Sequence, residues 1–442
     1  MKSHPSFAPQ YRLDNGAAGF ADDFQTLLTS KREVSEDIRD IVVDIIGQVQ
    51  REGDSALFDF TERFDRHDRR QQGLRVTEEE RTKARAGMTL EQADALKFAA
   101  DRIRTYHEKH MPQDHFDTDA QGVGLGWRWT PVDAAGVYVP GGTAAYPSTL
   151  LMNVIPAQVA GVERIAMVTP LTDGVLNPLI VGAADLLGID EIYAVGGAQA
   201  VAALAFGTPS IPMVDCIVGP GNAFVAAAKR EVYGQVAIDQ IAGPSEILVV
   251  ADNSNNPEWI AADLLSQAEH DPSSQAILIT DCDQFAQKVI DSVASQLSTL
   301  PRVQIAGASW TAFGAVITVD DLIADAPALA NALAAEHLII TAQPDVQESL
   351  YQSIKHAGAI FLGPHTPETL SDYVAGPNHV LPTARSARFS SGLGVLNFMK
   401  RTSVLSVSAA GMHALGGAAV TLAQAEGLEA HARAVQIRSN SV

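Results

Sequence analysis

The chain has 442 residues, a formal net charge of −21 from 31 basic and 52 acidic residues, and 46% hydrophobic residues. At about 150 residues per domain, this length predicts about three compact units. The hydrophobic content is sufficient for apolar cores and excludes a disordered or fibrous chain. The negative charge repels phosphate backbones and anionic membrane surfaces, so we expect neither nucleic acid nor a membrane as a partner.

The N-terminal part of the chain is predicted to be helical. Apolar residues recur at helical spacing from Ile38 to Val49, with Ser35 as the predicted N-cap and Gly53 as the stop. The first residues, MKSHPSFAPQYRLDNG, lack the apolar core of a secretory signal. We therefore expect a protein that is not exported.

A different pattern begins near residue 136. Short apolar runs alternate with helical stretches between Pro140 and Pro364, which is typical of βαβ units, with enough units for two doubly wound sheets. Glycine and serine between Ser390 and Gly394 predict a boundary before a helical tail. Two cysteines, each in a strand-like run, exclude a disulfide framework and fit a reducing cytoplasm.

Glycine corners follow several of the predicted strands. They lie at residues 138–142, 196–200 and 219–229, and each has a polar side chain beside it: Tyr138, Gln199 and Asn222. Such corners let a backbone approach a phosphate, although a glycine turn is often simple geometry. None completes G-x-G-x-x-G, because Phe224 stands where the third glycine would fall. Three such corners in one region, each with a polar neighbour, favour a ligand site and simple turn geometry about equally.

Pairs of titratable residues mark the C-terminal half. Glu336 and His337 are adjacent, and a carboxyl beside an imidazole suits general acid and base catalysis; a helix-terminal charge and a dipole-stabilised histidine are the alternative. Asp372 and His379 fall in a predicted loop, where polar residues are often only solvated. Glu426 and His431 fall in the helical tail, where a solvent-facing pair is the usual explanation.

Gln267 and His270 are spaced i, i+3 at the end of a predicted helix, so both can reach one metal ion. With Asp372 and His431 they would form a set of oxygen and nitrogen ligands that zinc accepts. Spacing alone does not bring these residues together, and a histidine after a helix is often a cap.

A resemblance links these signals. The segments GWRWTPVDAAGVYVPGG, IVGPGNAFVAAAKR, DLLSQAEHD, AEHL, DYVAGPNHVLPT and EGLEAHARAV occur in this order, and with them the chain resembles the histidinol dehydrogenase family over nearly its whole length. The resemblance implies an α/β fold of two Rossmann-like, incomplete doubly wound sheet domains with helical N-terminal and C-terminal extensions. We expect an N-terminal arm at 1–31, a first domain from 32–137 and 246–392, a second domain at 138–245 on the NAD side, and a dimer-exchange segment at 393–442.

The resemblance also implies roles for single residues. One zinc ion per subunit is expected on Gln267, His270, Asp372 and His431, and proton transfer on Glu336 and His337. Further substrate contacts fall on Ser245, His379 and Glu426, and NAD contacts on Tyr138, Gln199 and Asn222. The implied reaction is the oxidation of L-histidinol by two NAD in turn, through the aldehyde, to L-histidine. A homodimer is implied, in which Glu426 and His431 complete the partner's site.

Two other interpretations stay open. A paralogous zinc alcohol dehydrogenase for another small polyol or sulfonated alcohol would keep the metal set and change the substrate contacts, whereas Glu426 and His379 are retained here. A non-catalytic zinc- or nucleotide-binding scaffold would have lost Glu336 or His337, and both are present.

Overall fold

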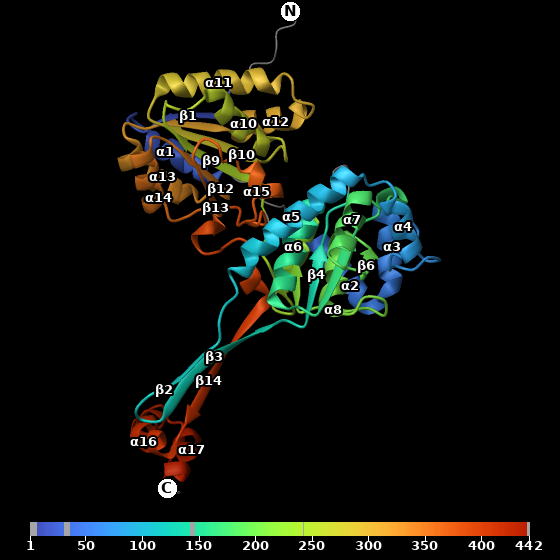
Figure 1. Cartoon of the computed structure of the whole chain (residues 1–442), viewed down its shortest axis with the longest axis vertical. Helices are drawn as coiled ribbons and strands as arrows, with labels where there is room; N and C mark the ends of the chain where they lie inside the picture. Colours follow the sequence, from blue (N-terminus) through green and yellow to red (C-terminus); the bar gives the residue numbers. More distant parts are fainter. Residues whose placement is uncertain (1–6, 31–35, 142–145, 242, 440–442) are drawn as a thin grey trace, which may run out of the picture.

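Two parallel β-sheets and a projecting three-stranded arm organise the chain (Figure 1). The structure is a computed structural model, and it describes residues 7–30, 36–141, 146–241 and 243–439. Ser35, the predicted N-cap, and Gly142 of the first glycine corner lie outside the described residues. In the part of the chain that is described, no helix is long and apolar enough to cross a membrane.

The six-stranded sheet has the order β1-β11-β10-β9-β12-β13, and all its strands are parallel. Its strands are β1 (Tyr11–Asp14), β9 (Glu246–Ala251), β10 (Gln275–Thr280), β11 (Ala315–Thr318), β12 (His337–Thr341) and β13 (Ala359–Leu362). Its helices are α1 (Phe20–Thr29), α10 (Pro257–Ala268), α11 (Asp283–Leu297), α12 (Val303–Phe313), α13 (Leu322–Leu333), α14 (Pro344–Ser353) and α15 (Thr369–Tyr373). Ile339 of β12 packs on one face with α10 and α11, while Leu338 and Ile340 pack on the other with α13 and α14. Both faces are therefore covered, which explains the nearly continuous apolar strands.

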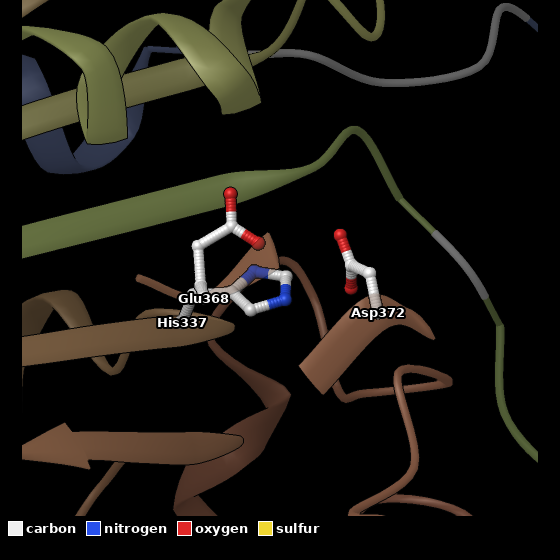
Figure 2. Close-up of side chains that lie close together, drawn as sticks. All are labelled: His337, Glu368 and Asp372. Atoms are coloured by element: carbon white, nitrogen blue, oxygen red, sulfur yellow. The ribbon is translucent and has the colours of Figure 1, made fainter. Parts of the chain in front are cut away.

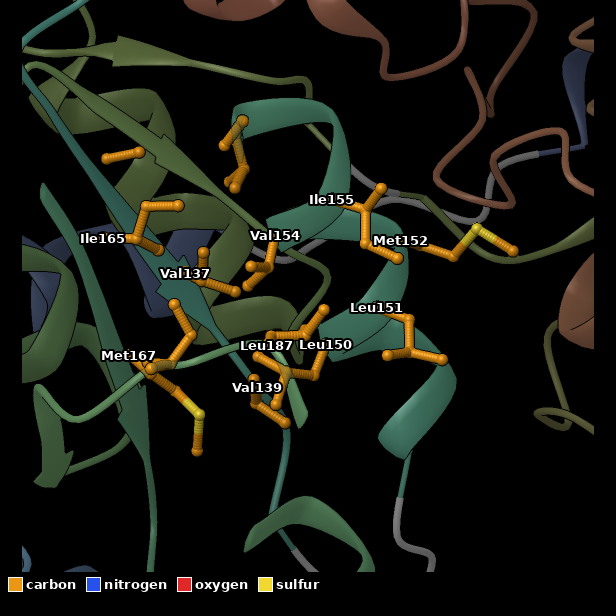
Figure 3. Packing of buried hydrophobic residues seen from close by; sticks show 14 of the residues in the cluster. Val137, Val139, Leu150, Leu151, Met152, Val154, Ile155, Ile165, Met167 and Leu187 are labelled. Atoms are coloured by element: carbon orange, nitrogen blue, oxygen red, sulfur yellow. The ribbon is translucent and has the colours of Figure 1, made fainter. Parts of the chain in front are cut away.

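The five-stranded sheet, also parallel, has the order β6-β5-β4-β7-β8. Its strands are β4 (Ala134–Tyr138), β5 (Arg164–Thr169), β6 (Ile192–Ala194), β7 (Cys216–Val218) and β8 (Ala237–Ile238). Its helices are α6 (Pro147–Ala160), α7 (Pro178–Leu186), α8 (Gly197–Phe206) and α9 (Ala223–Val232). In Figure 3, Leu150 and Val154 of α6 pack beside Val137 of β4. Helix α6 carries apolar residues on all its faces, as expected for a helix that is buried on nearly all sides.

The two sheets share one topology. Counted along the chain, β4 to β8 lie in the Rossmann order 3-2-1-4-5, and β9 to β13 lie in the same order with β1 added at the edge. This agrees with the expectation of two Rossmann-like domains. The sequence shows no repeat, so the likeness lies in the strand order.

The packing of residues 32–137 corrects the expected domain grouping. The helices of this region are α2 (Glu36–Glu52), α3 (Asp54–Asp65), α4 (Glu78–Arg85) and α5 (Leu90–Glu108). Val42 of α2 and Ile103 of α5 belong to the cores of the five-stranded sheet, not to those of the sheet at 246–392. Conversely, β1 belongs to residues 1–31, which were expected to form a separate N-terminal arm, and it pairs with β11 of the six-stranded sheet. Helical periodicity predicts an apolar face but does not say which sheet covers it.

The arm consists of β2 (His115–Thr118), β3 (Val123–Pro131) and β14 (Met399–Val407), followed by α16 (Ala409–Ala425) and α17 (Glu429–Ser439). It extends away from both sheet domains and carries the C-terminal helices at its end (Figure 1). Large apolar side chains remain exposed along it, among them Leu405 (66%) and Leu422 (65%). A surface of this kind is typical of an interaction site.

Short 3-10 helices complete the chain. They are η1 (Thr172–Gly174), η2 (Ser386–Arg388) and η3 (Val395–Phe398).

The predicted stop of α2 is confirmed, since the helix ends at Glu52 directly before Gly53.

Candidate functional site

A cavity of about 340 Å³ lies where the two sheet domains meet. From the five-stranded sheet it is lined by the corner that follows the carboxyl end of β7, at Gly219 to Gly221. From the six-stranded sheet it is lined by residues at the amino ends of strands, Ser245 before β9 and His337 at the start of β12. Opposite edges of the two sheets therefore form one site.

Most of the predicted metal, catalytic and substrate residues line this cavity: Ser245, Gln267, His270, Glu336, His337, Asp372 and His379. Glu426 and His431 do not line it. Both are exposed in the C-terminal helices of the arm, away from the two sheets (Figure 1).

Helix α10 delivers Gln267 to the cavity. The helix begins at Pro257, and the Asn256 side chain accepts the backbone N–H of Glu258 (2.9 Å), which caps the first turn. Gln267 lies in the last turn and is buried, and its Oε1 has no hydrogen-bond partner among the described residues. A buried carbonyl oxygen without a donor is costly, so this atom suits a cation ligand.

His270 lies just beyond the end of α10. Arg302 holds this end by donating to the backbone oxygens of Glu269 (2.9 Å) and His270 (3.3 Å). Burial lowers the pKa of the His270 imidazole, which favours the neutral form that binds metals.

His337 presents a free ring nitrogen to the cavity. Its Nδ1 lies 3.1 Å from the backbone oxygen of Glu246, so Nδ1 carries the proton and Nε2 is an acceptor. Nε2 is buried and has no partner within the described ranges. Burial lowers the pKa of His337 to about 4, which keeps the ring neutral at neutral pH. The ring is thus poised to accept a proton.

Glu336 is fixed beside it. Its Oε2 accepts the backbone N–H of Glu246 (3.0 Å). Complete burial raises the pKa of Glu336 well above its ordinary value, because the charged form loses its hydration. A cation in the same cavity would favour the ionised form.

Glu368 is a site residue that the sequence reasoning missed. Figure 2 shows His337, Glu368 and Asp372 close together, and one ligand atom of each lies within 4.8 Å of the others. Glu368 is buried at the start of α15, where the Ser266 hydroxyl donates to it (2.6 Å). Its i, i+4 spacing from Asp372 was the available signal, since it puts both carboxylates on one face of a helical turn.

Burial favours the protonated forms of Glu368 and Asp372, which lie close together. Burial, with the charge of Glu368 as a further cause, raises the pKa of Asp372 to about 8, and burial also raises the pKa of Glu368. Two buried carboxylates at this distance do not both ionise unless a cation joins them.

Asp372 lies on the short helix α15, not in the loop expected from the sequence, and His379 lies in the loop that follows. This segment is tied to the other domain. Arg102 of α5 donates to the backbone oxygen of Val374 (2.7 Å), and Asn378 donates to that of Met152 in α6 (2.6 Å). His379 Nδ1 lies 3.0 Å from the Asp372 backbone oxygen. Helices α5 and α6, which pack on the five-stranded sheet, therefore help to position the candidate metal ligand Asp372.

A second cavity of about 370 Å³ brings Tyr138, Gln199 and Asn222 together. The Tyr138 hydroxyl accepts the N–H of Gly197 at the start of α8 (3.1 Å), and Asn222 caps α9. Both amide atoms of Gln199 are buried without a partner in the described part of the chain. Two helix N-termini facing one cavity favour an anionic ligand such as a pyrophosphate.

This cavity also contains a residue that the sequence did not single out. Asp65 of α3 lines it, and one of its carboxylate oxygens is buried without a partner among the described residues. Pro140 lines both cavities, so the two adjoin.

The equivalent corner of the six-stranded sheet is closed. Beyond the carboxyl ends of β9 and β12, the Thr341 hydroxyl donates to the Asn255 side chain (2.6 Å), and the N–H of Gln343 donates to Asp252 (2.7 Å). These side chains fill the crevice where a Rossmann fold binds a nucleotide. The topology is repeated, but the open nucleotide cavity lies on the five-stranded sheet.

Comparison with known proteins gives consistent results. The profile of the histidinol dehydrogenase family matches residues 28–439. The chain is 58% identical over 430 residues to histidinol dehydrogenase of Rhodopseudomonas palustris, covering 97% of this chain and 99% of that one. With that of Rhodospirillum rubrum the identity is 57%, covering 97% and 98%. A crystal structure of histidinol dehydrogenase from Elizabethkingia anophelis is similar with a TM-score of 0.93 at 37% identity, covering 98% of both chains.

The raised pKa of Asp372 predicts how the site binds a cation. At pH 7, Zn²⁺ binding to the metal-free protein should release more protons from the wild type than from Glu368→Gln, because loss of the Glu368 charge removes one of the causes that raise the pKa of Asp372. The difference should shrink above pH 8, where the wild-type Asp372 also loses its proton. Calorimetry in buffers of different ionisation enthalpy measures the release. Glu348→Gln, on exposed α14, is the control; equal release by Glu368→Gln and the wild type would contradict the contribution of Glu368 to the pKa of Asp372.

Proposed function

The chain belongs to the histidinol dehydrogenase family, and from this premise we propose that its two adjoining cavities hold L-histidinol and NAD. The family is zinc- and NAD-dependent, and the activity of the chain is the two-step oxidation of L-histidinol to L-histidine. One observation carries the assignment of the cavities: residues from four separate segments, at 245, 267–270, 336–337 and 372–379, converge on one cavity, next to the one that contains Tyr138, Gln199 and Asn222.

We assign Gln267, His270 and Asp372 as this chain's zinc ligands. Their donor atoms are of the kinds that zinc accepts, and the orphaned Gln267 Oε1 supports the assignment. Bound zinc would hold and orient the imidazole and amine of the substrate. Glu368 would act beside them by adding negative charge next to Asp372.

His337 is the proton acceptor of each oxidation. In the first step the alcohol C–H passes to NAD as hydride, while the hydroxyl proton goes to Nε2 of the neutral imidazole. The hydrogen bond from Nδ1 to the Glu246 carbonyl holds the ring in the tautomer this requires. Ser245 and His379 line the same cavity, which supports their assignment as substrate contacts.

Glu336 serves the step between the two oxidations. The aldehyde must add water before a second hydride can leave, and a carboxylate is a suitable base for that addition. Ionisation of the buried Glu336 depends on a cation nearby, so its role as a base is linked to zinc loading. His337 must release its first proton to solvent before the second oxidation. The second hydride then leaves to a second NAD, and the neutral His337 again accepts a proton.

The reaction predicts a fixed stoichiometry. The purified, zinc-loaded protein should release two NADH per L-histidinol consumed, with L-histidine as the product, because one site performs both oxidations. Absorbance at the NADH band and amino-acid analysis measure both quantities. No NADH from histidinol, with turnover of another small alcohol, would favour the paralogous dehydrogenase. No turnover of any alcohol, with zinc or nucleotide still bound, would favour the non-catalytic scaffold.

The assigned roles separate two histidine variants. His337→Asn should keep zinc but lose turnover by about 100-fold or more, because the proton acceptor is gone. His270→Asn should lose both zinc and turnover, because a ligand is gone. Metal analysis of the purified variants, with a kcat for each, tests this. Full zinc content in His270→Asn would refute its assignment as a ligand.

We further propose a homodimer in which the arm of one subunit completes the site of the other. Glu426 and His431 are exposed and do not line this chain's cavity, while the arm carries uncovered apolar residues. Packing the arm on a second copy would cover these residues. It would also supply His431 as the fourth zinc ligand and Glu426 as a substrate contact.

A shared site predicts complementation between inactive variants. His337→Asn and His431→Asn should each be inactive alone, whereas their co-expressed mixture should recover about a quarter of wild-type activity. Mixed dimers form about half of the population by random pairing, and each has one site with neither substitution. Activity assays on the tagged and purified mixture test this. No recovery from proven mixed dimers would exclude exchange of His431.

We propose that the enzyme is cytoplasmic, on the basis of its two cysteines. Cys216 and Cys282 are both free, and Cys216 is buried. Free thiols fit the reducing cytoplasm, where the histidine pathway would supply the substrate.

A further inference from the structure

A buried ion pair lies at the wall between the two cavities. Lys229 of α9 and Asp239, which directly follows β8, form this pair, and Lys229 is only 2% exposed. Both residues line the substrate cavity. Neither has a role in the zinc site or in the proton transfers described above.

The pair holds both backbone polar groups of one glycine. Asp239 Oδ2 accepts the N–H of Gly219 (2.8 Å), and Lys229 Nζ donates to the carbonyl oxygen of Gly219 (2.9 Å). The other oxygen of Asp239 accepts the N–H of Gln240 (2.6 Å). Gly219 is therefore held from both sides by side chains that also neutralise each other.

Gly219 is packed too closely to accept a side chain. Its φ of +112° is rarely adopted by other residues, and a Cβ here would lie 2.1 Å from the backbone oxygen of Tyr138. The corner that follows β7 thus lies directly against the end of β4. A displacement at Gly219 would be transmitted to Tyr138, an assigned NAD contact.

The corner at Gly219 to Gly221 and the residue after it border both cavities. Gly219, Pro220 and Gly221 line the substrate cavity, and the next residue, Asn222, lines the dinucleotide cavity. The segment after Asp239 also contacts the loop beyond His379, because Gln240 donates to the Leu381 backbone oxygen and Gly243 donates to Thr383 Oγ1 (2.6 Å). The ion pair lies where the chain crosses from one sheet domain to the other.

A buried ion pair is weak evidence for stability, because desolvation of the two charges offsets their attraction. A fixed geometry is a better explanation here. Hydride transfer needs the donor carbon and the nicotinamide aligned in contact, and a displacement of about 1 Å can lower the rate about 100-fold.

We propose that Lys229 and Asp239 are positioning residues, which fix the Gly219 corner and thereby align the nicotinamide of NAD with the alcohol carbon of the substrate. This rests on the proposed function, since it takes the two cavities as the histidinol and NAD sites. The pair touches neither the zinc ligands nor the proton acceptors, so its loss should affect hydride transfer and leave metal binding intact.

The test replaces both partners, because removing one would leave an unpaired buried charge. Lys229→Met with Asp239→Leu removes both side-chain hydrogen bonds to Gly219. Lys229→Met with Asp239→Asn is the milder pair, since asparagine can still accept the Gly219 N–H. The control is Arg164→Met with Glu191→Leu, an ion pair of the same sheet (2.6 Å) that lines neither cavity.

The measurements are zinc content, NADH affinity by fluorescence, kcat, KM for L-histidinol, and the isotope effect with histidinol deuterated at the alcohol carbon. For the Met/Leu pair we expect unchanged zinc content and histidinol KM, a kcat lower by about 10–100-fold, and a larger isotope effect, because hydride transfer becomes rate-limiting. The Met/Asn pair should show a smaller decrease in kcat and a smaller increase in the isotope effect. The control pair should leave both kcat and the isotope effect unchanged.

Three outcomes would overturn the proposal. The first is a kcat and isotope effect equal to those of the control pair. The second is loss of zinc in parallel with activity. The third is failure of both Lys229 and Asp239 pairs to fold while the control folds, which would make the ion pair a stability element. Wild-type turnover, measured alongside, tests the proposed function separately.

Discussion

Burial of titratable side chains in one cavity is the constraint on which the rest of the site depends. Glu336, His337 and Asp372 line this cavity at the junction of the two domains, and Glu368 is buried close to His337 and Asp372. Burial favours the neutral form of each, so the imidazole is an acceptor and the carboxylates retain protons. Only a cation compensates such a cluster in its ionised form. The same burial therefore gives a neutral base, a metal site and a dependence of one on the other.

The fold meets this constraint by joining unlike edges of two similar sheets. The five-stranded sheet contributes the carboxyl ends of β4 and β7, where a Rossmann fold binds its ligand. The six-stranded sheet has the same strand order, but its equivalent crevice is closed by Asp252, Asn255 and Thr341. Its functional residues lie instead at the amino ends of β9 and β12. One sheet thus serves the dinucleotide and the other the metal and the proton transfers, with reaction occurring between them.

Contacts across the junction hold these edges in place. Arg102 and Asn378 tie the loop that follows α15 to α5 and α6. On the opposite wall, Lys229 and Asp239 fix the Gly219 corner. These contacts lie behind the reacting groups and carry no obvious motif. In the single chain, the arm leaves apolar residues such as Leu405 and Leu422 exposed, and Glu426 and His431, which it carries, do not line the cavity.

Local features can be read from the amino-acid sequence alone: buried strands as apolar runs, helix ends at residues such as Gly53, and candidate site residues through their type and order. These depend on neighbours a few positions away, which a linear pattern records. The three-dimensional packing was needed to show that α2 to α5 pack on the five-stranded sheet and that Ser245 and His337 lie at the amino ends of strands. It was also needed to show that Glu368 is buried beside Asp372, and that Asp65 and the Lys229–Asp239 pair line the cavities. Those features arise from burial between segments far apart in the chain, and a side chain's spacing does not reveal which distant surface will cover it.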